Sequence, residues 1–292
     1  MIYRVRHETA IRYAAPIGHA QFNLRLRPAY WPDQRIGSQS LTLNPQPVEQ
    51  REGFGPYLAT LTHLVFDHPL NRLVVLSEFD VEVAPRPDPG PGPTLAEVQE
   101  AALALTDLSV EAPVSYLFGS RIAGLDEEIG HWAKSIVAPG SAVLDAARAI
   151  SAEIHGGFAY QPGTTDSDSP PVKAFRERTG VCQDFAHVMI IALRTLGIPA
   201  AYVSGYLRTV PPPGMERLVG ADAMHAWVNV WCGPEIGWVG IDPTNDCLAG
   251  EGHILLAMGR DYADVSPIDG VFLGQSPQFM KVAVDVIELA AA

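Results

Sequence analysis

The chain has 292 residues, of which 47% are hydrophobic and 18% are charged, and its formal net charge is −13. This hydrophobic fraction is sufficient for a packed core and excludes a disordered chain. An acidic protein repels phosphates and anionic lipid surfaces, so nucleic acids and membranes are excluded as primary partners.

The N-terminal sequence MIYRVRHETAIRY lacks the basic start and apolar run of a secretory signal, so we expect a cytoplasmic protein. No segment reaches the ~20 consecutive apolar residues of a membrane helix. The three cysteines, Cys182, Cys232 and Cys247, are irregularly spaced and make a poor disulfide framework. Because the chain has neither a C-x-x-C pair nor an H-E-x-x-H helix, we predict no metal site and no cofactor.

The clearest break in the chain is segment 85–93, where every second residue is proline. Such a segment forms neither a helix nor a central strand, and we interpret it as a linker between two domains. Before it, residues 1–84 contain alternating polar and apolar runs that are cut by proline and glycine. This pattern predicts a small antiparallel β domain.

Residues 94–292 form the second predicted domain, and they begin with helical patterns. Thr94 and Glu97 match a capping box at the start of one helix, and Ser141 begins another. A strongly apolar helix is predicted from about Cys182 to Leu196, and several strands follow it. The predicted fold class is therefore α+β, with an N-terminal antiparallel β domain followed by a core of helices packed on an antiparallel sheet.

Cys182 lies in the first turn of that apolar helix if Thr179 or Gly180 is the N-cap. The free amides and the dipole of a helix N-terminus stabilise a thiolate, and the same amides can bind an oxyanion. The simpler alternative is a small structural cysteine in the core. We interpret Asp184 as a first-turn charge, and His187 as a core or supporting histidine because it lies on another face of the helix.

A predicted hairpin supplies a histidine and a carboxylate. Segment 224–231 alternates as a strand and carries His225, and the next strand ends at Asp242. A turn centred between Gly233 and Pro234 places His225 directly opposite Asp242, with Cβ atoms about 4.5–5.5 Å apart. A register slip of one residue would separate the two side chains, and a solvated His–Asp pair is the simpler alternative.

Cys182, His225 and Asp242 together satisfy the requirements of nucleophilic acyl transfer. The thiol attacks a carbonyl, the imidazole accepts a proton and later donates one, and the carboxylate fixes the imidazole tautomer. The reaction would pass through an acyl-thioester that water or an amine resolves.

Three motifs that contain these residues resemble the bacterial transglutaminase-like cysteine peptidases. They are TGVCQDFAH at 179–187, MHAWV at 224–228 and GWVGIDPTN at 237–245. Segments 158–164 and 259–267 are also similar to stretches of that family. The resemblance covers roughly residues 95–275, and the first 83 residues look like the β-rich region that often precedes this core.

The resemblance implies a papain-like core in which Cys182 is the nucleophile, His225 the general base and Asp242 the orienting acid. It leaves the second oxyanion donor open. Tyr160, Gln183 and Trp227 are candidates for oxyanion binding or substrate positioning, and a packed aromatic is the simpler interpretation of Tyr160.

The acceptor of the acyl group is not determined by the sequence. The favoured function is cleavage of a peptide, isopeptide or other amide bond, with a peptide, a protein or a small amide as substrate. The alternatives are a transglutaminase or N-acyltransferase that uses an amine, and a binding module that retains the fold without catalysis. We find no acidic cluster resembling a calcium loop, and the sequence does not predict the oligomeric state.

Overall fold

The computed structural model describes residues 1–165, 169–209 and 224–289. Its helices are α1 (Leu95–Ala104), the 3-10 helix η1 (Pro113–Tyr116), α2 (Glu127–Ile136), α3 (Val143–Gly157), α4 (Pro171–Glu177), α5 (Cys182–Thr195) and α6 (Tyr262–Val265). Its strands are β1 (Ile2–Ile17), β2 (His19–Leu24), β3 (Gln34–Asn44), β4 (Glu49–Phe54), β5 (Leu58–Phe66), β6 (Leu70–Val83), β7 (Ala159–Tyr160), β8 (Thr179–Gly180), β9 (Ala200–Leu207), β10 (Met224–Trp231), β11 (Trp238–Asp242), β12 (Cys247–Leu248), β13 (His253–Gly259), β14 (Ile268–Leu273) and β15 (Gln278–Leu289).

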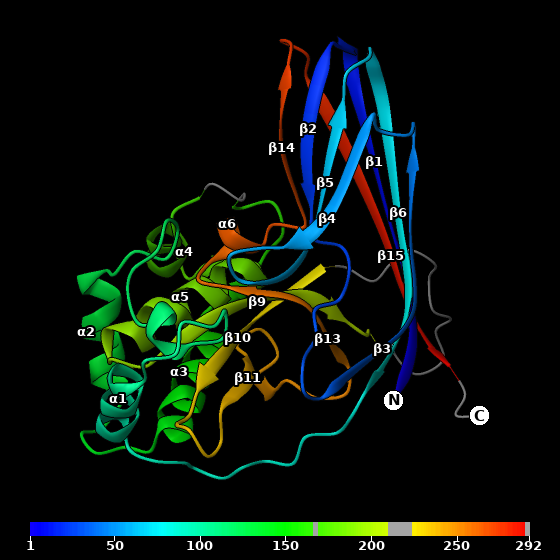
Figure 1. Cartoon of the computed structure of the whole chain (residues 1–292). Helices are drawn as coiled ribbons and strands as arrows, with labels where there is room; N and C mark the ends of the chain where they lie inside the picture. Colours follow the sequence, from blue (N-terminus) through cyan, green and yellow to red (C-terminus); the bar gives the residue numbers. More distant parts are fainter. Residues whose placement is uncertain (166–168, 210–223, 290–292) are drawn as a thin grey trace, which may run out of the picture.

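Long antiparallel strands form a tall arm that rises from a body of helices and shorter strands (Figure 1). One sheet of the arm has the strand order β15-β1-β6-β3. The second sheet contains β14, β2, β5 and β4, and it continues through the β5–β13 pair into β9, β10, β11 and β12 of the body. Apolar side chains fill the space between the two sheets, among them Ile11, Phe22, Leu64, Phe66 and Leu73. The predicted N-terminal antiparallel β region is therefore confirmed.

The proline-rich segment marks a change of sequence, but the sheets run across this boundary. The C-terminal strand β15 pairs with β1 over its length, and β14 pairs with β2. The segment itself lies along the body, where the carbonyls of Pro91 and Pro93 accept hydrogen bonds from the amides of Leu144 and Val143. Strands from both ends of the chain thus complete the arm beside the helical body.

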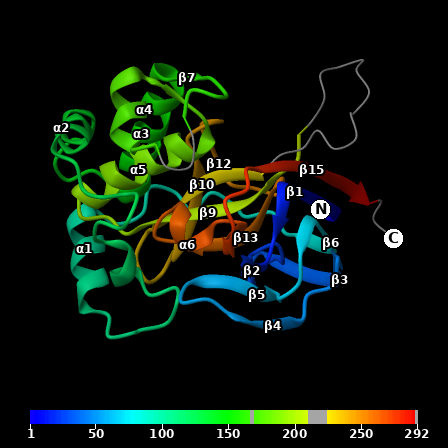
Figure 2. The same cartoon turned by 90° about the horizontal axis from the view of Figure 1, so that it is seen from above.

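The helices cover one side of the body's strands, as the view from above shows (Figure 2). The capping box at the start of α1 is present, because the Thr94 amide donates to the Glu97 carboxylate at 2.8 Å and the Glu97 amide donates to the Thr94 hydroxyl. Helix α5 is central and is buried from Asp184 to Arg194. In the described part of the chain, no helix is long and apolar enough to cross a membrane.

The β10–β11 hairpin forms, but its register differs by two residues from the prediction. Trp231 pairs with Trp238, and Asn229 pairs with Gly240. The reason is a longer turn, which is closed by hydrogen bonds from Cys232 to Gly237 and from Gly237 to Gly233. Both glycines have positive φ, at 92° and 72°, which favours glycine at these positions. A shift of two residues preserves the face of each side chain, so His225 and Asp242 meet diagonally instead of directly.

Gly205 in β9 lies directly opposite His225 and gives the ring of Trp227 its space. A Cβ at this position would lie 2.2 Å from the carbonyl oxygen of Ile254 and 2.6 Å from the Trp227 ring. Trp227 stacks on His225, with ring centroids 6.3 Å apart and planes 27° apart. The position of the histidine therefore depends on a glycine in the neighbouring strand.

We predict that Gly205→Ala lowers the free energy of unfolding by about 1–3 kcal/mol, the usual cost of overpacking. The added methyl must displace either backbone or a buried indole. Urea denaturation measures the loss, and Gly53→Ala is the control because a Cβ there meets no atom within 4 Å. Equal stability of the two variants would contradict this account of the packing.

Candidate active site

Cys182 is the first residue of α5, but its N-cap is Val181 and not Thr179 or Gly180 as predicted. Val181 has an extended backbone, and its carbonyl accepts the first helical hydrogen bond from Phe185. The carboxylate of Asp184 accepts from the Val181 amide at 2.9 Å and from the Thr165 hydroxyl at 2.6 Å. Asp184 is therefore a first-turn charge, as predicted, and its carboxylate holds the backbone of Val181, the residue before Cys182.

The chain enters this helix through a tightly held turn. Arg178 has a left-handed backbone with φ of 52°, and its guanidinium lies over the rings of Trp132, Phe158 and Phe175 at 5.6, 4.7 and 4.3 Å. Cation–π contacts of this kind offset the cost of the left-handed conformation. A Cβ on Gly180 would lie 2.7 Å from the Asp184 carboxylate, so the capping contact requires this glycine.

Asp242 at the end of β11 is fully buried and accepts five hydrogen bonds. One oxygen accepts from the amides of Thr244 and Asn245 in the following turn. The other accepts from the Asn245 side chain at 2.6 Å, from His225 Nε2 at 2.7 Å and from His253 Nε2 at 3.2 Å. A buried carboxylate requires such partners, because an unpaired charge in the protein interior is strongly destabilising.

His253 is a site residue that the sequence analysis missed. The Gly250 amide donates to His253 Nδ1 at 3.2 Å, so Nε2 of this ring carries the proton and donates it to Asp242. Ligand atoms of His225, Asp242 and His253 lie within 4.8 Å of one another, a spacing that a metal ion could also use. The hydrogen bonds within the group already account for this spacing.

The protonation states follow from the same contacts. Burial lowers the pKa of His225, but its hydrogen bonds to Asp242 and Cys182 outweigh burial and raise the pKa to about 9. Burial raises the pKa of Asp242, but the hydrogen bonds from His225 and His253 outweigh it and hold this pKa well below the usual range. Because Nε2 of His225 is engaged by Asp242, Nδ1 is the nitrogen left for the thiol of Cys182.

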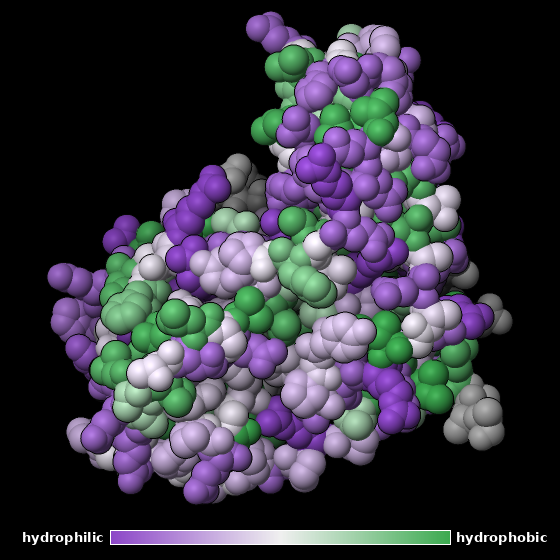
Figure 3. Space-filling model, viewed as in Figure 1, coloured by the Kyte–Doolittle hydropathy of each residue, from purple (hydrophilic) through white to green (hydrophobic). Residues whose placement is uncertain are grey.

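A cleft of about 250 Å³ opens at Cys182 and His225. Gln183, the residue after Cys182, also lines this cleft. The arm provides one wall of this cleft, with His7 and Thr9 from β1 and Met280 and Val282 from β15. Figure 3 shows that the visible face of the arm is mostly hydrophilic, with apolar residues scattered over it.

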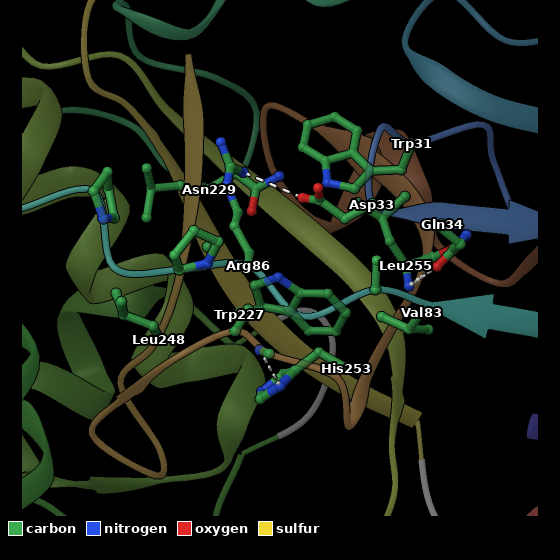
Figure 4. A pocket seen from close by; sticks show the side chains of 17 residues that line it. Trp31, Asp33, Gln34, Val83, Arg86, Trp227, Asn229, Leu248, His253 and Leu255 are labelled. Carbon is green, nitrogen blue, oxygen red and sulfur yellow. Dashed lines mark hydrogen bonds and ion pairs between the residues drawn. The ribbon is translucent and has the colours of Figure 1, made fainter. Parts of the chain in front are cut away.

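The other candidates lie outside this cleft. Tyr160 on β7 is 55% exposed and packs edge-on against Phe185, although burial and the nearby charge of Cys182 raise its pKa. Trp227 faces a separate cavity of about 60 Å³ on the far side of the histidines, where Figure 4 shows it beside His253. It is therefore a packing partner of both histidines and not part of the cleft wall.

His187 is buried in the core. This agrees with the first of the two interpretations given for it, a core histidine or a supporting histidine. Its Nε2 accepts a hydrogen bond from the Tyr262 amide, and its ring stacks on Tyr202 at 4.9 Å. Burial lowers its pKa to about 4, so the ring is neutral at physiological pH.

The fold and the site define a class: a helix-borne cysteine beside a His–Asp pair on an antiparallel sheet, as in transglutaminase-like and papain-like proteins. The chain belongs to the transglutaminase-like superfamily, whose family model matches residues 130–243. The model of the bacterial transglutaminase-like N-terminal region matches residues 3–82. The family and the fold class expected from the sequence motifs are therefore confirmed.

Individual relatives agree with this assignment. An uncharacterized protein of Mycobacterium tuberculosis is 34% identical, covering 98% of this chain and 92% of its own length. A protein-glutamine gamma-glutamyltransferase of Pseudomonas aeruginosa is 41% identical over 93 residues, which are 31% of this chain and 14% of that protein. A crystal structure of a protein from Cytophaga hutchinsonii, described as a "Putative Cysteine Protease", has a TM-score of 0.75 at 21% identity. The match covers 100% of this chain and 92% of that one, so the two proteins share a fold.

We predict that His225 titrates near pH 9 in an NMR experiment with ¹³C-labelled histidine, well above its ordinary pKa of 6.5. Because the pKa is higher in the folded state, the protonated ring stabilises the fold fully below pH 6.5, and this contribution is lost as the pH rises through about 9. Asp242→Asn removes the main contact that raises the pKa and should bring the midpoint down to 6.5 or lower. An unchanged midpoint in this variant would show that a group other than Asp242 raises the pKa of His225.

Proposed function

We propose that this protein is a cysteine-dependent acyl-transfer enzyme in which Cys182 is the nucleophile, His225 the general base and acid, and Asp242 the residue that orients His225. The observation that supports it most directly is the position of His225, which lies beside Cys182 and bonds through Nε2 to the buried carboxylate of Asp242 at 2.7 Å. The favoured reaction is cleavage of a peptide, isopeptide or other amide bond.

Each group has a defined role in this mechanism. Because the pKa of His225 is raised to about 9, its Nδ1 already holds the proton given up by the Cys182 thiol at neutral pH, and the thiolate attacks the substrate carbonyl carbon. The resulting tetrahedral intermediate collapses, the amine leaves with the proton from His225, and an acyl-thioester remains on Cys182. Water, deprotonated by the same imidazole, then releases the acid. The raised pKa of His225 suits the donation step, because the imidazolium persists at neutral pH.

The backbone amides at the N-terminus of α5 support the proposal further. The first residues of a helix have backbone N–H groups without helical partners, and the dipole places partial positive charge there. An oxyanion that forms on the attacked carbonyl would therefore meet a favourable field at Cys182.

The other two cysteines supply an internal control for a labelling test. Burial raises the pKa of Cys232 to about 12, and burial together with the nearby carboxylates raises the pKa of Cys247 to about 11. Both thiols should therefore be protonated at pH 7 and react slowly.

We predict that iodoacetamide at pH 7 alkylates Cys182 at least tenfold faster than Cys232 or Cys247, which peptide mass spectrometry measures. Cys182→Ala should abolish hydrolysis of fluorescein-labelled casein, while Cys247→Ala, the same substitution at a cysteine outside the cleft, should retain it. Casein hydrolysis by the Cys182→Ala variant, or equal alkylation of all three thiols, would exclude Cys182 as the nucleophile and favour a binding module.

A second candidate function is acyl transfer to an amine, and one observation favours it. The segment shared with the glutamyltransferase of Pseudomonas aeruginosa is 41% identical. The triad chemistry is common to both reactions, and the outcome depends on whether water or an amine reaches the thioester first.

The two reactions are distinguished by adding dansylcadaverine to casein digestion. For a hydrolase, we expect less than a tenth of the product to carry the dansyl label at millimolar amine, because water outcompetes the amine. If most of the product carried the dansyl label, acyl transfer to an amine would replace hydrolysis as the proposed function. In either case Asp242→Asn should lower the rate by roughly 10⁴-fold, since the imidazole loses its correct tautomer.

A further inference from the structure

Two hydroxyl groups on β9 face the cleft without a partner. Tyr202 and Ser204 lie on the same face of the strand, and both line the cleft with Cys182 and His225. Their side chains are buried, with 2% and 5% exposure. Within the described ranges, neither hydroxyl forms a hydrogen bond, yet neither is among the fully enclosed polar atoms that lack a partner. The two oxygens therefore reach the space of the cleft.

The next residue on this face shows the contrast. Tyr206 is also fully buried, but its hydroxyl bonds to His7 Nδ1 at 2.7 Å, and His7 Nε2 bonds to Thr9 at 2.8 Å. Buried hydroxyls are normally paired in this way, because an unpaired one costs about 1–3 kcal/mol. Because Tyr202 and Ser204 lack such a partner among the described residues and line the cleft beside Cys182, their hydroxyls are available to bind a ligand there.

We propose that the Tyr202 hydroxyl donates a hydrogen bond to the carbonyl oxygen that Cys182 attacks, and that Ser204 binds a second carbonyl of an extended peptide substrate. This inference rests on the proposed function and adds a substrate class to it. When the thiolate forms its bond to the carbonyl carbon, the π electron pair moves to the oxygen, where Tyr202 and the Cys182 amide would both donate. When the C–N bond breaks, the pair returns and the amine leaves with the proton of His225.

The Tyr202 side chain is well suited to this role. Its ring is fixed by stacking on His187 and by an edge contact with Tyr262, so the hydroxyl is preorganised. Burial, followed by the nearby charge of Cys182, raises the pKa of Tyr202 well above its ordinary value, so the hydroxyl remains a donor. Tyr160, the earlier candidate, is largely exposed and lies outside the described lining of the cleft.

The positions of Tyr202 and Ser204 along β9 point to an extended chain. Their Cα atoms are alternate positions of one strand, about 6.6 Å apart, and an extended peptide that runs along β9 repeats its carbonyls on one side at about the same interval. The opposite wall carries Met280 and Val282 of β15, which would contact apolar side chains of such a peptide. A small amide would use only the first hydroxyl.

The test of Tyr202 compares two reactions of Cys182. Alkylation by iodoacetamide forms no oxyanion, whereas acylation by p-nitrophenyl acetate does. We expect Tyr202→Phe to alkylate within twofold of the wild-type rate but to acylate about 10²-fold more slowly, the usual effect of losing one oxyanion donor. Tyr160→Phe is the matched control and should change neither rate.

The outcomes separate the two proposals. Unchanged acylation in Tyr202→Phe, or an equal loss of both reactions, overturns the role of Tyr202 while Cys182 remains the nucleophile. If Cys182 of the wild-type protein fails to alkylate faster than Cys247, the proposed function fails first.

The test of Ser204 compares two esters. Ser204→Ala should react normally with p-nitrophenyl acetate but about tenfold more slowly with the p-nitrophenyl ester of an N-acetylated apolar tripeptide, because only the longer ester reaches the second hydroxyl. A variant that retains the wild-type ratio of the two rates overturns the role of Ser204 and the preference for an extended peptide.

Discussion

The buried carboxylate of Asp242 is the constraint on which the site depends. It has no exposure to water, so its charge is tolerable only because five hydrogen bonds compensate for the lost hydration. Those bonds join the end of β11, the following turn, His225 of β10 and His253 of β13. One charge therefore fixes the relative positions of three strands and orients the imidazole beside Cys182. The contacts that orient the imidazole are also contacts that hold the sheet together.

A second consequence concerns the two regions that the sequence separates at the proline-rich segment. The body supplies Cys182 and His225, but the arm supplies the wall opposite them, through β1 and β15. The sheet that carries His225 also continues into β5 and β2 of the arm. The N-terminal region is therefore better described as one wall of the cleft at Cys182 and His225 than as an appended module.

Local signals in the sequence were sufficient for much of this structure. The Thr94–Glu97 capping box, the apolar helix that starts at Cys182 and the alternation around His225 all depend on residues within a few positions of one another. The hairpin register was wrong by two because Gly233 and Gly237 both adopt left-handed conformations and lengthen the turn. The side chains of His225 and Asp242 nevertheless meet, diagonally and not directly opposite as predicted, since an even shift preserves the face of each side chain.

Other features could not be predicted because they depend on contacts between distant segments. His253 reaches Asp242 only because β13 pairs with β9, and the sequence between them gives no sign of that pairing. Tyr202 lines the cleft because one face of β9 lies under the N-terminus of α5, which is a property of layer packing. The N-cap at Val181 depends on the carboxylate of Asp184, whose role as an acceptor is clear only in three dimensions.

The pairing of β15 with β1 has a consequence for synthesis. The strand that closes the cleft opposite Cys182 is the last element of the described chain to leave the ribosome, and its partner β1 is the first. During translation, the nascent chain therefore contains Cys182 and His225 before β15 can complete the wall of the cleft. The cleft is closed on this side only after the pairing of β15 with β1 joins segments far apart in the sequence.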